Sequence, residues 1–157
     1  MKKHLFFSIT AIVFALDLGV KYLVKYILSD PFGSITVIPG FFRIVYVENH
    51  GLLFGFFSRM PLWIKLAAML VGILFLGYYV FRHYNEFLKG ELWAFALIFG
   101  GGLGNIIDRM INGAVFDFLL LYIKNRQWPT FNVADICIDV GIGLYILMQF
   151  TGRKNAS

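Results

Sequence analysis

The stretch LWAFALIFGGGLGNIIDRMI, residues 92–111, is long enough to cross a membrane and carries its polar residues at one end. A helical crossing of the hydrocarbon core needs about 20 mostly apolar residues. Asn105, Asp108 and Arg109 fall in its last turns, where polar groups are costly in lipid. Gly100 and Gly104 are four residues apart, which allows another helix to approach closely. The stretch therefore predicts a packed transmembrane helix with a structural or functional role for the polar residues at its end.

Three other stretches have a similar length and apolar character, at residues 5–28, 61–81 and 133–150. Hydrophobic residues make up 59% of the 157-residue chain and charged residues only 15%. Soluble domains usually carry about a quarter charged residues. The mean hydropathy is +0.75. We therefore predict a membrane protein with four transmembrane helices, built as a single domain over residues 1–157.

Basic residues at the ends of the predicted helices indicate an orientation. With four crossings, three basic groups fall on one side, and by the positive-inside tendency that side is the cytoplasm. These groups are Lys2 with Lys3, Arg82 with Lys89, and Arg153 with Lys154. Both termini are then cytoplasmic, and the first helix stays as an uncleaved anchor because no Ala-x-Ala-like exit follows it. The bias is moderate, since the outer connections also carry Arg43, Arg59, Lys124 and Arg126.

The first outer connection has the composition of short strands. Residues 35–57, ITVIPGFFRIVYVENHGLLFGFF, are rich in β-branched and aromatic residues and are interrupted at Pro39-Gly40 and at Asn49-His50-Gly51. We expect a small β element at the outer membrane surface, where aromatic residues are favoured. In the second outer connection, LLLYIKNRQWP at residues 119–129 suggests a short interfacial piece.

Polar side chains collect near the outer ends of the predicted helices. Asp17 and Lys21 are four apart on one helical face, in the order that favours an ion pair. A structural pair and a role in holding substrate both explain them. Asn105, Asp108 and Arg109 can share one helical stripe. We expect Asp108 to be a support and the other two to face substrate or organise the site.

Asp117 and Asp135 are the candidates for acid–base chemistry. Asp117 is flanked by the apolar residues 115–116 and 118–120, which offer no partner and should raise its pKa by desolvation. Asp135 has a simpler explanation, because Asn132 could be the N-cap of the fourth helix with Asp135 in its first turn. If the helix ends bring the two carboxyl groups together, both cannot ionise easily. One would then act as general acid while the other activates water as general base.

Other enzyme mechanisms lack their usual motifs. The chain has no Gly-x-Ser-x-Gly turn and no His-Glu-x-x-His motif. Its one cysteine, Cys137, excludes an internal disulfide and a multi-cysteine metal site. We expect no metal and no cofactor. The net charge of +5 comes from dispersed residues, so no nucleic-acid partner is expected.

The alternative from another class is a small four-helix transporter that uses intramembrane acids as proton or cation sites. A transporter predicts acids near the middle of the membrane. The polar residues of this chain collect near one face instead, which favours chemistry at the membrane surface.

Five ordered blocks together resemble the lipoprotein signal peptidase family, the bacterial signal peptidase II enzymes. They are Asp17 with Lys21, NHGLLFG from Asn49, GNIIDR from Gly104, GAVFDF from Gly113, and FNVAD from Phe131, and they cover nearly the whole chain. The resemblance implies an aspartic peptidase whose catalytic pair is Asp117 and Asp135. The residues expected to bind substrate or organise the site are Asp17, Lys21, Asn49, Gly51, Asn105, Asp108, Arg109 and Asn132.

The resemblance also implies a substrate, a fold and a location. The substrate is a diacylglyceryl-modified prolipoprotein, cut on the amino side of its lipidated cysteine. The fold is four transmembrane helices with an extracytoplasmic β-cradle and an outer loop with a short interfacial helix. The location is the bacterial cytoplasmic membrane, with the active site near its outer face. The expected partners are the prolipoprotein and membrane lipid, and the enzyme is expected to be a monomer.

The chain departs from the family pattern at a few positions. Leu18 stands where a polar residue is usual, and Leu52 and Leu53 add bulk where small residues are usual. Phe116 stands where valine is common, and Asp139 adds an acid in the fourth helix for which the sequence suggests no role. We expect these departures to affect substrate specificity and inhibitor fit.

Overall fold

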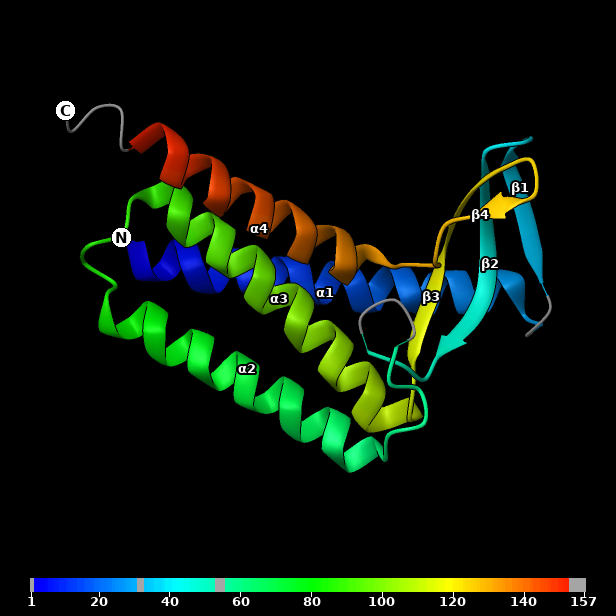
Figure 1. Cartoon of the computed structure of the whole chain (residues 1–157), viewed down its shortest axis with the longest axis horizontal. Coiled ribbons are helices and arrows are strands. Elements are labelled where there is room, and N and C mark those ends of the chain that lie inside the picture. The colour runs from blue at the N-terminus through cyan, green and yellow to red at the C-terminus, as the bar shows by residue number, and fades with distance from the viewer. Residues whose placement is uncertain (1, 31–32, 53–55, 153–157) are drawn as a thin grey trace.

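Four long helices and one small sheet make up the protein (Figure 1). The computed structural model describes residues 2–30, 33–52 and 56–152. The helices are α1 Lys2–Leu28, α2 Leu62–Arg82, α3 Lys89–Asn112 and α4 Val133–Gly152. Each is long and apolar enough to cross a membrane, so the four predicted spans are confirmed. The sheet covers one end of the bundle, and α1 begins and α4 ends at the other, as an even number of crossings requires.

Helix α3 is the centre of the bundle and contacts the other three helices. Its glycines make this possible, as predicted for Gly100 and Gly104. A Cβ on Gly100 would lie 2.8 Å from the Thr10 carbonyl oxygen of α1, and one on Gly104 would lie 2.5 Å from Asp17 Oδ2. In lipid, burying apolar surface contributes little to helix association, because the surrounding acyl chains are also apolar. Small residues and polar contacts therefore decide which helices approach each other.

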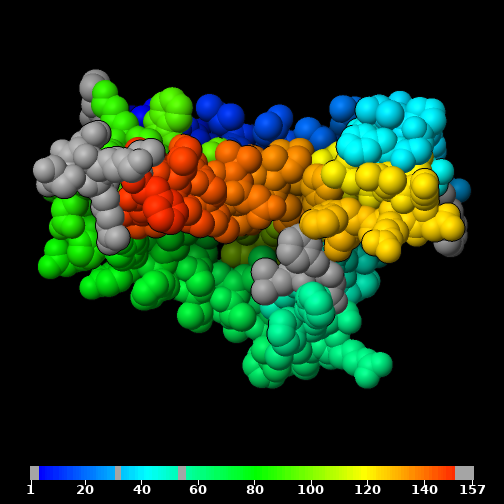
Figure 2. Space-filling model, turned by 45° about the horizontal axis from the view of Figure 1, so that its top comes forward, coloured from blue at the N-terminus to red at the C-terminus, as the bar shows by residue number. Residues whose placement is uncertain are grey.

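The sheet is antiparallel and has the strand order β1-β2-β3-β4. Its strands are β1 Ser34–Ile38, β2 Phe42–Asn49, β3 Val115–Ile123 and β4 Arg126–Gln127. The first connection forms the expected small β element, a hairpin that turns at Gly40 with a φ of 81°. The second connection supplies the other two strands, and Asn49 lies opposite Val115 in the register. Figure 2 shows these segments, cyan and yellow, gathered into one lobe at the end of the bundle.

The second connection, for which the sequence suggests a short interfacial piece, forms a strand over residues 115–123. The described residues of both outer connections contain no helix. The physical reason is the packing of one face of β3, on which Phe116 and Phe118 contact Val24 and Leu28 of α1. Side chains with a period of two bury one face of a sheet, and β2 supplies the hydrogen-bonding edge.

The opposite end of the bundle is closed by aromatic packing. We call this cluster the aromatic end, and its buried residues are Phe6, Val80, Tyr84, Phe87, Leu92, Phe95 and Ala96. The rings of Phe87 and Phe95 have centroids 4.9 Å apart, and those of Phe6 and Phe99 are 5.8 Å apart. The helices are therefore fixed at both ends, by rings at one and by the sheet and polar side chains at the other.

Candidate active site

Asp117 and Asp135 lie on two segments that start at the sheet end of the bundle. Helix α3 ends at Gly113, whose left-handed backbone, with a φ of 74°, turns the chain into β3. Asp117 is the third residue of β3 and is 1% exposed, while Asp135 lies in the first turn of α4 and is partly exposed. Both side chains line one cavity of about 410 Å³. We call this space the carboxylate cavity.

The carboxylate cavity has a polar side and an aliphatic side. The polar side carries the amides of Asn49 and Asn105 and the guanidinium of Arg109. The aliphatic side includes Leu52, Ala68, Val115, Ile138 and Ile142. A second hollow of about 350 Å³ also borders on Asn49 and Thr130. An extended chain that reaches the two acids can therefore continue past Asn49 along the end of the sheet.

Asn132 joins the two carboxyl groups. Its Nδ2 donates to Asp117 Oδ1 at 2.7 Å and to Asn105 Oδ1 at 3.2 Å. Its backbone N–H donates to Asp135 Oδ2 at 3.2 Å, and its Oδ1 accepts from the backbone N–H of Asp135 at 3.0 Å. Asn132 is fully buried. Because one rigid residue bonds to both acids, their carboxyl groups are held beside the same cavity.

Asp117 has hydrogen-bond partners, contrary to the prediction from its neighbours in sequence. Asn49 Nδ2 donates to Asp117 Oδ2 at 2.8 Å, and Asn132 donates to Oδ1. These partners come from β2 and from the segment before α4, so local sequence could not reveal them. Burial away from water still raises the pKa of Asp117 from 3.8 to about 6, despite the opposing hydrogen bond from Asn49. The charge of Asp135 adds to the rise.

Asp135 caps its own helix and also faces the carboxylate cavity. Its reciprocal bonds with Asn132 are those of a capping box, so the simpler explanation of both residues describes a real contact. Asp135 Oδ1 in addition accepts from Asn105 Nδ2 at 2.8 Å. Capping uses one oxygen and leaves the other beside the cavity. The capping and site explanations therefore do not exclude each other.

Lys21 is the centre of a buried network behind the cavity. Its Nζ lies 2.8 Å from Asp17 Oδ2 and 3.2 Å from Asp108 Oδ2, and it donates to Asn105 Oδ1 at 3.2 Å. Asp17 Oδ1 accepts from the backbone N–H of Ala134 at 2.9 Å. Asp17 and Lys21 are 0% and 3% exposed, and neither lines the cavity. The geometry favours a structural pair, which turns the amide nitrogen of Asn105 toward Asp135.

Asp108 bonds to the start of β3. Its Oδ2 accepts from the backbone N–H of Phe116 at 2.8 Å, and its Oδ1 accepts from Asn112 Nδ2 at 2.6 Å. Phe116 directly precedes Asp117 in the strand. The buried carboxylate of Asp108 therefore sets the position of the neighbouring acid without lining the cavity itself.

Arg109 reaches the carboxylate cavity from α3. Its Nη2 donates to the carbonyl of Gly51, and its Nη1 lies 3.7 Å from the sulfur of Met69. The N–H of Gly51 donates to Asn49 Oδ1 at 2.9 Å. Arg109 is 5% exposed, and its Nε has no partner among the residues that the structure describes. Arg109 thus fixes the turn that presents Asn49 and keeps one donor unpaired.

Lys65 is a residue that the sequence analysis missed. It lies near the start of α2 and is 4% exposed, and its Nζ donates to the carbonyls of His50 and Ser58. These bonds tie the segment that follows Asn49 to the helix. The signal was a lysine one turn into an apolar span, since a buried ammonium in such a position needs partners.

The residues that depart from the family pattern fall in different places. Leu52 and Asp139 line the carboxylate cavity, with Asp139 one turn beyond Asp135 on α4. Phe116 is buried against α1, and Leu18 lies on α1 away from the cavity lining. Leu53 lies outside the described residues. Among the departures that the structure describes, Leu52 and Asp139 alone are therefore placed to contact a ligand in the cavity.

Comparisons with known proteins match this chain over almost its full length. The family model described as signal peptidase (SPase) II matches residues 9–151. A lipoprotein signal peptidase of Sulfurihydrogenibium sp. is 37% identical, with 95% of this chain and 93% of the relative aligned. One from Thermodesulfovibrio yellowstonii is 40% identical, with 86% of this chain and 87% of the relative aligned.

A solved structure supports the same grouping. It is described as a bacterial membrane enzyme structure by the in meso method at 2.3 Å resolution. The TM-score is 0.83 at 28% sequence identity, and the match covers 98% of this chain and 92% of the other. The arrangement of helices and sheet is therefore shared with an enzyme of the membrane.

Proposed function

The chain belongs to the signal peptidase II family, and on that premise we propose that Asp117 and Asp135 are its catalytic pair. Proteins of this family cleave signal peptides from prolipoproteins, and this chain is such a peptidase with several membrane-spanning helices. The transporter alternative finds no support in the comparisons.

The observation that carries the proposal is the bonding of Asn132 to both acids. Asn132 reaches Asp117 through its side chain and Asp135 through its backbone N–H, at 2.7 Å and 3.2 Å. Both carboxyl groups border one cavity that is open to a ligand. A single water molecule held between two carboxyl groups is the arrangement that aspartic peptide hydrolysis needs.

The proposed reaction uses one protonated and one ionised carboxyl group. The ionised group takes a proton from the water, whose oxygen attacks the carbon of the scissile carbonyl. The protonated group donates to the carbonyl oxygen, and a tetrahedral intermediate forms. Collapse of this intermediate breaks the C–N bond as a carboxyl proton passes to the leaving nitrogen. The pKa of about 6 for Asp117 supports proton exchange near neutral pH, and the two acids titrate as a pair.

The other polar residues are proposed to hold the peptide and the acids in place. Asn105 and Asn49 donate to Asp135 and Asp117, and Arg109 lines the cavity. A guanidinium and amides suit the carbonyls of a peptide backbone, and fixed positions lower the entropic cost of reaction. The ion pairs of Lys21 with Asp17 and Asp108 support these residues from outside the cavity. The carbonyl of Gly51 accepts a hydrogen bond from Arg109 and so holds its guanidinium in place.

The proposed substrate is a prolipoprotein that carries a diacylglyceryl group on the cysteine after the cleaved bond. The aliphatic side of the carboxylate cavity supports this choice, because Leu52, Ile138 and Ile142 can contact acyl chains. We propose a monomer in the bacterial cytoplasmic membrane, with both termini in the cytoplasm and the site near the outer face. The collection of the acids at one end of the helices supports a site at a membrane surface. The domain is proposed to be the whole of residues 1–157.

The test is cleavage by the purified full chain in detergent micelles. Two synthetic prolipoprotein peptides share one sequence, and only one of them carries the diacylglyceryl group. We expect cleavage of the lipidated peptide on the amino side of its cysteine and no cleavage of its twin. The Asp117→Asn variant, purified in the same way, tests the catalytic pair. Equal cleavage of both peptides would overturn the lipid requirement, and equal activity of the variant would overturn the catalytic pair.

A further inference from the structure

A larger hollow lies at the far end of β3, away from the carboxylate cavity. Its volume is about 820 Å³, and we call it the hairpin hollow. Its lining comes from Phe41 at the β1–β2 turn and from residues 121–128 of the β3–β4 hairpin. Ile123 lies six positions after Asp117 along the strand, which corresponds to about 20 Å. A ligand in the hairpin hollow therefore does not occupy the site of cleavage.

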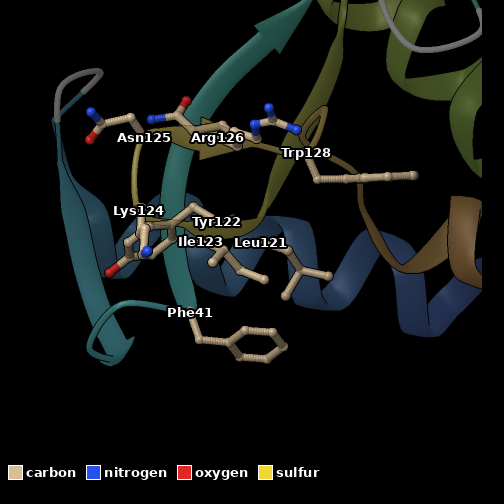
Figure 3. A pocket seen from close by; sticks show the side chains of 9 residues that line it. Phe41, Leu121, Tyr122, Ile123, Lys124, Asn125, Arg126 and Trp128 are labelled. Atoms are coloured by element: carbon tan, nitrogen blue, oxygen red, sulfur yellow. The ribbon is translucent and has the colours of Figure 1, made fainter.

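The hairpin hollow combines an apolar surface with basic side chains. Figure 3 shows the side chains of Phe41, Leu121, Ile123 and Trp128 around the opening, with Arg126 on the hairpin. Phe41, Ile123 and Trp128 are 46%, 63% and 63% exposed. Lys124 and Arg126 also line it, and none of the nine lining residues is acidic. The charge of this surface therefore complements an anion.

The wall of the hairpin hollow is held rigidly. The Tyr122 hydroxyl accepts from the backbone N–H of Gly40 at 3.0 Å, and its ring lies 4.6 Å from the guanidinium of Arg43. The backbone N–H of Trp128 donates to the Leu121 carbonyl at 2.8 Å. These contacts fix both hairpins relative to each other, so the hollow exists before a ligand arrives.

Lys124 occupies a strained position at the tip of the hairpin. Its φ of 53° is in the left-handed region, which glycine and asparagine adopt more readily than lysine. Lys124 and Arg126 also stand in a connection that the positive-inside tendency would leave poor in basic residues. Both observations indicate that these charges are kept for what they contact.

We propose that the hairpin hollow binds the headgroup of an anionic phospholipid of the surrounding membrane. The phosphate would lie between Lys124 and Arg126, and the start of the acyl chains would lie on Phe41, Ile123 and Trp128. Tryptophan and basic residues together favour the boundary between headgroups and acyl chains, and anionic lipids attract basic side chains there. The sheet covers the helix ends, so this boundary is within reach of its hairpins (Figure 1).

The test reads lipid contact at Trp128 and does not depend on catalysis. The chain has three tryptophans, so Trp63→Phe/Trp93→Phe leaves Trp128 as the only tryptophan, whose emission is excited separately from that of tyrosine. The full chain is placed in nanodiscs of phosphatidylcholine that contain brominated phosphatidylglycerol or, in a parallel sample, brominated phosphatidylcholine. Bromine quenches fluorescence on contact. We expect the anionic lipid to quench at least about twofold more than the zwitterionic lipid at equal mole fraction, because it is enriched near the basic residues.

Charge variants and a competitor identify the ligand. Lys124→Gln/Arg126→Gln should abolish the preference, while Arg59→Gln/Lys89→Gln removes two charges elsewhere and should preserve it. Soluble glycerol phosphate should leave the preference intact. Equal quenching by the two lipids, or a preference that survives in Lys124→Gln/Arg126→Gln, would overturn the proposal. Loss of the preference with glycerol phosphate, or with an acidic peptide in its place, would assign the hollow to that soluble ligand instead.

Discussion

At the aromatic end, α1, α2 and α3 meet through rings and small apolar residues, whereas near the sheet α1 and α3 meet through Asp17, Lys21 and Asp108. Both regions are buried, and most of their residues belong to helices that are long and apolar enough to cross a membrane. Ring packing contributes dispersion contacts that do not depend on a particular partner atom. The stability of the polar end depends on each donor and acceptor, because a buried charge that loses its partner there is not solvated by water. Stability and catalysis are therefore coupled at the polar end and separable at the aromatic end.

Substitution of either catalytic carboxyl group is expected to have the largest effect on the cleavage rate. Asp117→Asn and Asp135→Asn retain the size of the side chain but remove the ionisable group and replace one accepting oxygen with a donor. Each should lower the rate of prolipoprotein cleavage by roughly a thousandfold or more, since general acid–base action is lost. Cleavage rates and melting temperatures in detergent are measured together. Near-normal cleavage by either variant, with the fold intact, would contradict the catalytic assignment.

The next prediction compares Lys21→Met with Phe95→Ala. Removing the ammonium leaves Asp17 and Asp108 without their partner, and a broken buried ion pair costs about 3–5 kcal/mol. Truncating a buried phenylalanine costs about as much. The free energy of unfolding should fall in both variants, but the cleavage rate per folded molecule should fall only in Lys21→Met. A matching loss of rate in Phe95→Ala would remove the distinction between the two ends.

The pH dependence of stability gives a third comparison. The pKa of Asp117 is raised in the folded protein, so the folded state holds this proton more tightly than the unfolded chain. The associated stability is fully present below pH 3.8 and is lost as pH rises through about 6. The loss is on the order of 3 kcal/mol, because one pKa unit corresponds to about 1.4 kcal/mol.

Melting temperatures of the wild-type chain and Asp117→Asn, taken at pH 4.5 and 7.5, measure that contribution. The variant cannot ionise at residue 117, so its advantage over the wild type should grow as pH rises. The same pH change should leave the difference between Phe95→Ala and the wild type constant, because no ionisable group differs between them. A constant difference for Asp117→Asn would mean that the pKa of Asp117 is not raised.

The smallest predicted effect concerns Lys65, which orders the backbone beside the cavity. Lys65→Met removes the donor to the carbonyls of His50 and Ser58, while Lys65→Arg retains a cation. The kcat/KM of Lys65→Met should fall about tenfold, equivalent to about 1.4 kcal/mol, chiefly through KM. Lys65→Arg should recover most of this loss. A change in melting temperature without any change in kcat/KM would assign Lys65 to folding alone.

Part of the site could be predicted from spacing along the helices. Asp17 with Lys21, and Asn132 with Asp135, lie within one helical turn, and both contacts are present. The joining of Asn49 to Asp117 could not be predicted this way, because it depends on the register of β2 against β3. Lys65 was missed for a similar reason, since its partners belong to the preceding connection. Contacts within a turn follow from geometry, whereas contacts between segments depend on packing.

The sequence alone determined that four apolar stretches cross a membrane, because length and hydropathy suffice for that conclusion. It also determined that the polar groups gather at one end of the bundle, because the position of each polar residue along its apolar stretch shows which end of the helix it occupies. Tertiary structure decided that residues 115–123 form a strand and that Asn132 bonds to both acids. It decided these features because strand pairing and side-chain burial join residues far apart in the chain. Local propensity carries no information about such distant partners.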